Sequence, residues 1–202
     1  MRKLLWILLF ASLIAVVAAT VITRARRALP VPSPRAYSYL PGFVLTNRDG
    51  REVTLVDLAG APFVADFIFT SCPGPCPLMT ARMAELGGRL PKGTRRVSIT
   101  VDPSFDTPEV LDAYARRFGA GEDWLFLTGP REAIWELARD GFKLGVAESA
   151  PGSPPEQGAF IHSTKFVLVD AEGGIRGYYD GLEPEELERL AVDAKAISRS
   201  RS

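Results

Sequence analysis

The chain has 202 residues, of which 47% are hydrophobic and 24% are charged, which is the composition of a globular protein rather than a disordered one. Its 24 basic and 24 acidic side chains cancel, but five of the basic ones lie in residues 1–29, where there is no acid. The remainder therefore carries 19 basic against 24 acidic side chains. An acidic domain without a basic stripe is a poor nucleic-acid binder, and we expect no nucleic-acid partner.

Residues 1–27 are predicted to be an N-terminal membrane anchor. Residues 4–23 carry no charge and are rich in Leu, Ile, Val and Ala. Twenty residues at about 1.5 Å each are long enough to cross a bilayer as one transmembrane helix. A signal sequence cleaved after Ala19 is the alternative, but the apolar run continues beyond that point, which favours the anchor. Residues 28–41 contain four prolines and are predicted to be a semi-rigid linker.

Residues 42–197 are predicted to form one domain in which strands alternate with helices. Residues 43–45 and 53–55 flank an Asp-Gly pair, which is typical of a β-hairpin. The nearly continuous apolar run 62–69 predicts a strand that is buried on both faces. The patterns that follow predict helices over 77–90, 107–118, 130–139 and 184–196, and strands over 96–101, 124–128, 166–169 and 175–179.

This order of elements predicts an α/β fold, with a sheet that has helices on both faces. A thioredoxin-like fold with an added N-terminal β-hairpin fits the order, preceded by the transmembrane helix. Residues 149–157, with three prolines, are predicted to be a loop, and residues 198–202 a disordered tail.

Both cysteines of the chain, Cys72 and Cys76, lie where the buried strand gives way to a helix. Ligands gather at the carboxyl ends of strands in α/β folds, and the positive end of a helix lowers the pKa of a thiol. A thiolate both attacks disulfides and binds soft metals, so a redox pair and half of a metal site both remain open. A plain structural disulfide is a third interpretation, but so short a loop would gain little stability from it.

The chain has a single histidine, His162, 86 residues beyond Cys76. It precedes the predicted strand 166–169, in a loop that we expect to pack against the thiol loop. Two sulfurs and one imidazole suit Cu(I), with Zn(II) as the alternative if a fourth ligand joins. A lone histidine is ordinarily a surface or core residue, so spacing alone leaves the assignment open.

Other polar and sulfur side chains near these residues have simpler interpretations. Asp66, inside the buried strand, is either a hydrogen-bonded buried acid or a carboxylate that tunes the thiol pKa from behind the site. Asp102 and Asp106 end a strand and cap the next helix, although they could also shape the pocket. Four further residues are predicted to be core: Met79, Met83, Trp124 and Trp135.

Three blocks of sequence resemble the signatures of Sco/SenC copper chaperones, and they occur in the order that the family has. They are residues 69–77, with the two cysteines, residues 100–108, with Asp102 and Asp106, and residues 162–170, which begin with His162. The resemblance spans about residues 40–195 and includes the membrane anchor before them. It implies a thioredoxin-like domain tethered to the cell membrane by a single pass and facing the periplasm or the cell exterior.

The resemblance also implies a function. Family members bind copper through the two cysteines of the first block and the histidine of the third, so the metal ligands would be Cys72, Cys76 and His162. They assist assembly of the CuA centre of cytochrome c oxidase, so the expected partner is the CuA subunit or another copper protein. The expected cargo is Cu(I), with Cu(II) left open, and such a metallochaperone need not catalyse any turnover. The alternative is a thiol–disulfide oxidoreductase, using Cys72 and Cys76, that keeps the cysteines of a partner reduced.

Overall fold

The computed structural model describes residues 12, 14, 16–18, 36–150 and 160–199. The chain divides into two compact units, Met1–Val31 and Pro32–Ser202. In the first unit the described residues are helical. Among the described residues, no helix is both long enough and apolar enough to span a membrane. Most of the predicted anchor lies outside the described residues.

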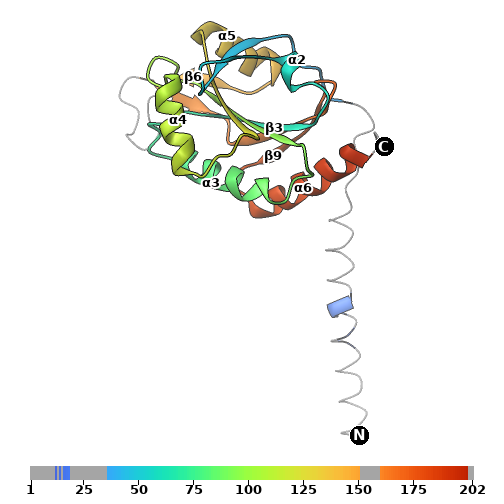
Figure 1. Cartoon of the computed structure of the whole chain (residues 1–202). Coiled ribbons are helices and arrows are strands. Elements are labelled where there is room, and N and C mark those ends of the chain that lie inside the picture. The colour runs from blue at the N-terminus through green and yellow to red at the C-terminus, as the bar shows by residue number, and fades with distance from the viewer. Residues whose placement is uncertain (1–11, 13, 15, 19–35, 151–159, 200–202) are drawn as a thin grey trace, which may run out of the picture. The chain divides into compact units, whose positions relative to one another are not determined.

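The second unit is the predicted α/β domain, with a seven-stranded sheet that has helices on both faces. In chain order its elements are β1 (Val44–Asn47), β2 (Glu52–Thr54), α2 (Leu55–Leu58), β3 (Phe63–Ile68), α3 (Cys76–Gly87), β4 (Arg95–Thr100), α4 (Pro108–Arg117), β5 (Trp124–Thr128), α5 (Arg131–Glu136), the π-helical turn η1 (Leu137–Gly141), β6 (Val146–Glu148), β7 (Phe160–His162), β8 (Lys165–Val169), β9 (Ile175–Asp180) and α6 (Pro184–Arg199). Helices α3 and α6 lie along one side of the sheet, with α4 beside α3, and α5 lies on the other side (Figure 1).

The strand order is β2-β1-β5-β4-β3-β8-β9, in which β3, β4 and β5 are parallel and the other neighbours are antiparallel. All six residues of β3 are buried, because this strand has a neighbour on each side and is covered on both faces. The prediction of a strand buried on both faces, made from the nearly continuous apolar run 62–69, is therefore confirmed. Since parallel strands end at the same edge of a sheet, the loops after β3 and β4 meet there.

The predicted N-terminal hairpin is confirmed as β1 and β2, which pair around Gly50. Gly50 has a φ of +82°, a conformation that glycine adopts without steric cost. Residues 37–40, at the end of the predicted linker, are bound to the domain, because the backbone N–H groups of Tyr37 and Leu40 donate to carbonyls beside β9.

Three features differ from the sequence-based expectations. The predicted helix 130–139 is the shorter α5, which continues into η1. Strands β6 and β7 were not predicted; they form a separate two-stranded sheet around a segment that lies outside the described residues. Helix α6 continues to Arg199, two residues into the predicted tail, and its last turns bury Ala194 and Ile197 against the domain.

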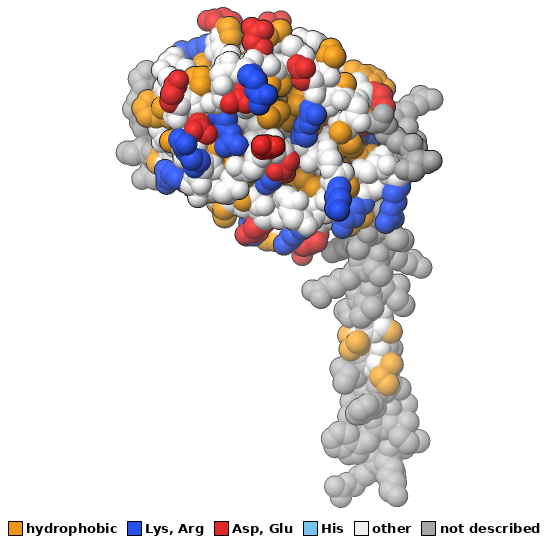
Figure 2. Space-filling view, viewed as in Figure 1, with side chains coloured by type: hydrophobic (Ala, Val, Ile, Leu, Met, Phe, Trp, Pro, Cys, Tyr) orange, Lys and Arg blue, Asp and Glu red, His pale blue; other side chains and the backbone are white. Residues whose placement is uncertain are grey.

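Basic and acidic side chains are interspersed over the face in view in Figure 2.

Candidate metal centre

The two thiols lie in the turn between β3 and α3. The N–H of Cys72 donates to the carbonyl of Phe69 (3.2 Å), and the N–H of Gly74 approaches the Cys72 sulfur at 3.4 Å. Cys76 is the first residue of α3, followed by a proline, which is favoured there because the first turn has no backbone acceptor for its missing N–H. Both residues are thiols rather than a disulfide. Cys72 is 6% exposed and Cys76 fully buried.

The structure corrects the expected effect of the helix terminus on Cys76. Its thiol shares a hydrogen bond with the Cys72 sulfur, and this contact, burial and the nearby Asp66 carboxylate together raise the pKa of Cys76. The positive end of α3 does not outweigh these three effects. The pair therefore keeps a proton at Cys76 at neutral pH, and a bound cation would have to displace it.

Asp66 is fully buried in the middle of β3. The hydrogen bond to Cys72 raises the pKa of Cys76 and burial raises the pKa of Tyr114, and Asp66 makes a smaller contribution in the same direction to both. Both interpretations of Asp66 therefore stay predictions. Tyr114 belongs to α4, and its hydroxyl lies 2.8 Å from the Thr80 hydroxyl, which is also 2.8 Å from the Cys76 carbonyl. Helix α4 is thus tied to the first turn of α3.

Asp106 holds the thiol turn to the end of β4. Its carboxylate accepts hydrogen bonds from the Thr70 N–H (3.1 Å), the Thr70 hydroxyl (2.5 Å) and the Thr100 hydroxyl (2.5 Å). Thr70 is two residues before Cys72, so these hydrogen bonds hold in place the segment of chain that leads to the first thiol. Burial raises the pKa of Asp106 by more than these hydrogen bonds lower it. The residue that caps α4 is Thr107, rather than Asp106, and its hydroxyl accepts from the N–H of Val110 (3.4 Å).

His162 is the last residue of β7, rather than part of a loop as expected, and it pairs with Val146 of β6. Its side chain lies outside what the structure describes. The strand itself is placed by Phe160, whose ring packs edge-on against Phe69, with 5.5 Å between the ring centroids. Phe69 is three residues before Cys72 and Phe160 two residues before His162. At about 3.3 Å per residue in a strand, the hairpin that carries His162 therefore lies beside the thiol turn.

The donor chemistry of this turn fits a soft monovalent cation. Two buried thiols, one in the turn before α3 and one at its first residue, have the sulfur chemistry that such a cation prefers. Within the described part of the chain, which does not include the His162 side chain, no three Cys, His, Asp or Glu side chains gather in a way that could hold a metal. The methionine prediction is confirmed, because Met79 and Met83 are fully buried in the core.

A model of the SCO1/SenC family matches residues 32–197, which include both cysteines and the histidine. The chain belongs to the SCO1/SenC family. It is similar to a solved SCO1/SenC family lipoprotein from Bacillus anthracis, with 34% identity and a TM-score of 0.72 over 84% of this chain and 99% of that one. The family prediction and the thioredoxin-like α/β fold are thereby confirmed.

The chain is also similar to two further solved Sco proteins. BsSco, a member of the Sco family of cytochrome c oxidase assembly proteins in which a disulfide switch was identified, is 32% identical, with a TM-score of 0.71 over 85% of this chain and 98% of that one. Yeast Sco1, solved with copper bound, is 26% identical, with a TM-score of 0.64 over 82% of this chain and 90% of that one.

Sequence reasoning about this SCO1/SenC chain missed two sets of residues at the site. Asp106 was interpreted as a capping residue, and only the fold brings Thr70 and Thr100 to its carboxylate. Trp135 was predicted to be core, but it is half-buried and its indole N–H donates to the carbonyl of Val101 (3.1 Å). No periodic pattern could reveal the contacts of Asp106 with Thr70 or of Trp135 with Val101, because these partners are more than thirty residues apart along the chain.

Proposed function

We propose that this chain is a metallochaperone that binds Cu(I) through Cys72, Cys76 and His162 and delivers it for assembly of the CuA centre of cytochrome c oxidase. Copper is its cargo, taken up and released by exchange of ligands. Membership of the SCO1/SenC family supports this proposal, as do the copper bound to yeast Sco1 and the role of the Sco family in oxidase assembly. The delivery partner would be the CuA subunit or another copper protein.

The observation that carries the proposal is the contact between Phe160 and Phe69. It brings a strand that contains the chain's one histidine to a turn that contains both cysteines. Two thiolates and an imidazole form a donor set that prefers Cu(I) to hard cations. Both sulfurs are shielded from water, so a bound cation would be protected from competing hard ligands.

We expect the reduced full-length protein, purified without a histidine tag, to bind about one Cu(I), with sulfur and nitrogen neighbours visible by copper-edge X-ray absorption. His162→Ala should remove the nitrogen neighbour and weaken binding by at least about tenfold. The reaction of Cys72 and Cys76 with disulfides should be unaffected in this variant. Unchanged copper affinity after His162→Ala would remove His162 from the ligand set.

Copper uptake should depend on pH because the pKa of Cys76 is raised. The folded protein holds the Cys76 proton at neutral pH, and Cu(I) binding must release it, so the apparent affinity should increase as the pH rises. For one proton the increase is about tenfold per pH unit below the thiol pKa. Competition with a Cu(I) chelator between about pH 6 and pH 8 measures this slope. A flat profile would mean that Cys76 is already a thiolate before copper arrives.

We further propose that residues 1–27 anchor the domain in the cell membrane by a single pass, with the domain facing the periplasm or cell exterior. The uncharged length of residues 4–23 supports the anchor, and the similar Bacillus anthracis protein is described as a lipoprotein. A cleaved signal sequence is the alternative. Mass spectrometry of the protein extracted from membranes distinguishes an intact N-terminus from cleavage after Ala19.

A second candidate function is thiol–disulfide exchange, which the hydrogen bond between the Cys76 thiol and the Cys72 sulfur favours. Two hydrogen-bonded sulfurs can form a disulfide with little movement of the turn while a partner's disulfide is reduced to two thiols. The similar BsSco protein contains a disulfide switch. The two functions are linked, because oxidation of Cys72 and Cys76 removes both sulfur ligands.

A further inference from the structure

Arg131 joins α5 to both strands of the hairpin that carries His162. Its guanidinium lies 4.4 Å from the centroid of the Trp135 ring system and 5.6 Å from that of Phe160. It also forms an ion pair with Glu148. Trp135 is one helical turn beyond Arg131 on α5, Glu148 ends β6 and Phe160 begins β7. We call these four residues the Arg131 clamp.

The clamp is attached to the edge of the sheet where the thiol turn begins. The rings of Trp135 and Phe160 meet edge-on, with 6.3 Å between their centroids, and Phe160 packs in the same way against Phe69. The indole N–H of Trp135 donates to the carbonyl of Val101, directly after β4. The clamp therefore connects the hairpin to the ends of both β3 and β4.

The β6–β7 hairpin is too small to be held beside the thiol turn by its own strand pairing. Strands β6 and β7 have three residues each and form a sheet of their own, and an isolated two-stranded sheet is at best marginally stable in water. Ala147 and Glu148 are exposed, and Val146 is half-buried. Phe160, in contrast, is buried. The placement of β7 thus depends on what packs around Phe160 and on what holds Glu148.

We propose that Arg131 is a positioning residue for His162: by contacting Trp135, Phe160 and Glu148 at once, it keeps β7 beside the thiol turn before copper arrives. This inference rests on the proposed copper ligands and adds a residue outside them. A site that is already assembled binds its ligand more tightly than one assembled only part of the time, by the fraction of molecules in the competent arrangement.

We expect the planar shape of the Arg131 guanidinium to contribute more than its charge to holding β7 in place. The Arg131 and Glu148 side chains are 34% and 61% exposed, and exposed ion pairs contribute little by themselves. A planar guanidinium can stack on two aromatic rings, whereas an ammonium interacts as a point charge. We therefore expect Glu148→Gln to have a small effect, Arg131→Lys an intermediate one and Arg131→Ala the largest.

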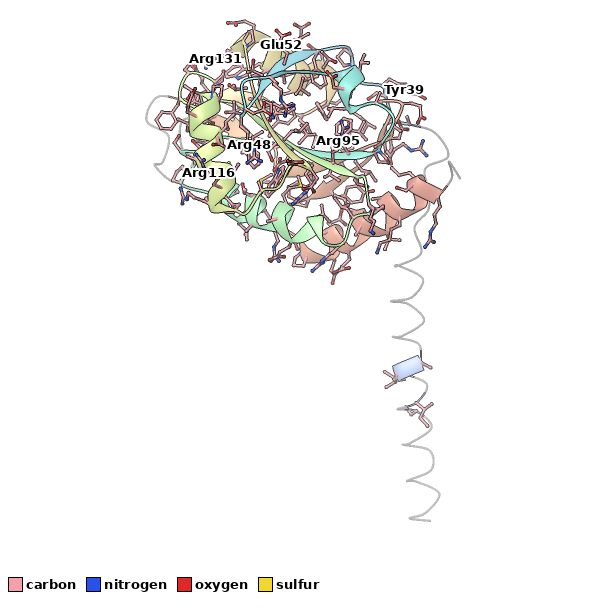
Figure 3. The ribbon with its side chains drawn as sticks, in the orientation of Figure 1. Tyr39, Arg48, Glu52, Arg95, Arg116 and Arg131 are labelled. Carbon is pink, nitrogen blue, oxygen red and sulfur yellow. The ribbon has the colours of Figure 1, made fainter. Side chains whose placement is uncertain are left out.

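The experiment measures Cu(I) affinity of the reduced full-length protein by competition with a Cu(I) chelator. Arg131→Ala should weaken binding by about tenfold, and Arg131→Lys should recover part of the loss. Arg116→Ala is the matched control, because this arginine lies on α4, away from α5 (Figure 3), and pairs with Asp112. The reaction of the two cysteines with a disulfide should be the same in all of these variants.

A double-mutant cycle separates positioning from general damage to the fold. If Arg131 acts through His162, the variant Arg131→Ala/His162→Ala should bind Cu(I) as His162→Ala does. Equal weakening by Arg131→Ala in both backgrounds would overturn the inference. So would an unchanged affinity of Arg131→Ala when His162→Ala is weakened, and in that case the proposed function stands. If His162→Ala itself binds normally, the proposed ligand set fails together with the inference.

A spectroscopic readout is independent of copper. The chain has one histidine, so selective histidine labelling yields one backbone amide signal from β7. Its hydrogen exchange should be faster in Arg131→Ala and unchanged in Arg116→Ala, because the pairing of β6 with β7 opens more often without the clamp. An exchange rate equal to that of the native protein would show that Arg131 does not hold the strand.

Discussion

Cys76→Ser is expected to lower the Cu(I) affinity of the reduced protein by at least about a hundredfold, because loss of a partner that only supports a metal ligand already costs about 10- to 100-fold. A serine hydroxyl is a hard donor that keeps its proton, so it does not replace a thiolate for Cu(I). Chelator competition measures the affinity, and copper-edge absorption should report one sulfur neighbour fewer.

The matched control is Ser71→Ala, an exposed position in the same turn, which should bind copper as the native protein does. Comparison with His162→Ala separates the two functions, since Cys76→Ser should weaken copper binding and abolish disulfide formation, whereas His162→Ala should affect copper binding alone. Native-like Cu(I) binding by Cys76→Ser would refute the two-sulfur site.

Asp106→Ala is expected to lower the free energy of unfolding by about 2–3 kcal/mol, because it removes the acceptor of three hydrogen bonds, one from the buried Thr100 and two from the half-buried Thr70. Chemical denaturation followed by circular dichroism measures the loss. Asp140→Ala, at an exposed acid, is the control and should change stability by no more than about 0.5 kcal/mol. Equal stability of the two variants would mean that the Asp106 contacts are replaced by water.

Asp106→Asn tests the charge of the same side chain. Because the pKa of Asp106 is raised in the folded protein, the folded state binds its proton more tightly than the unfolded state does. The corresponding stability is present below the ordinary carboxyl pKa and is lost as the pH rises through the raised one. The asparagine variant should lack this part of the pH dependence, which denaturation at a series of pH values would detect.

Most of the fold could be predicted because it depends on local patterns. The apolar run of β3, interrupted only by Asp66, indicates a strand with neighbours on both sides, and its six residues are buried. The sequence Thr107-Pro108-Glu109 predicts the start of α4, where Thr107 caps the helix. Among the strands that the structure describes, β6 and β7 were missed, since each has three residues, too few to show an alternating pattern, and no Asp-Gly turn marks them as it marks β2.

The candidate site was predictable in part. Two cysteines after a buried strand and before a helix place both thiols at the carboxyl edge of the sheet, where they lie. The pKa of Cys76 was expected to be low and is instead raised. The expectation was based on the helix terminus alone, which can be predicted from the sequence. The hydrogen bond to Cys72, the depth of burial and the closeness of Asp66 depend on the tertiary structure, so the sequence did not reveal them.

By itself, the sequence determined the order of strands and helices, the thiol pair between β3 and α3 and the family resemblance, because each depends on residues close together along the chain. Only the tertiary structure decided which distant side chains surround that turn. Asp106 accepts hydrogen bonds from Thr70, the ring of Phe160 packs against that of Phe69, and the guanidinium of Arg131 contacts Trp135 and the hairpin. Such contacts form when the ends of the parallel strands lie at the same edge of the sheet and the hairpin folds back on them. The spacing of residues along the chain does not predict these contacts.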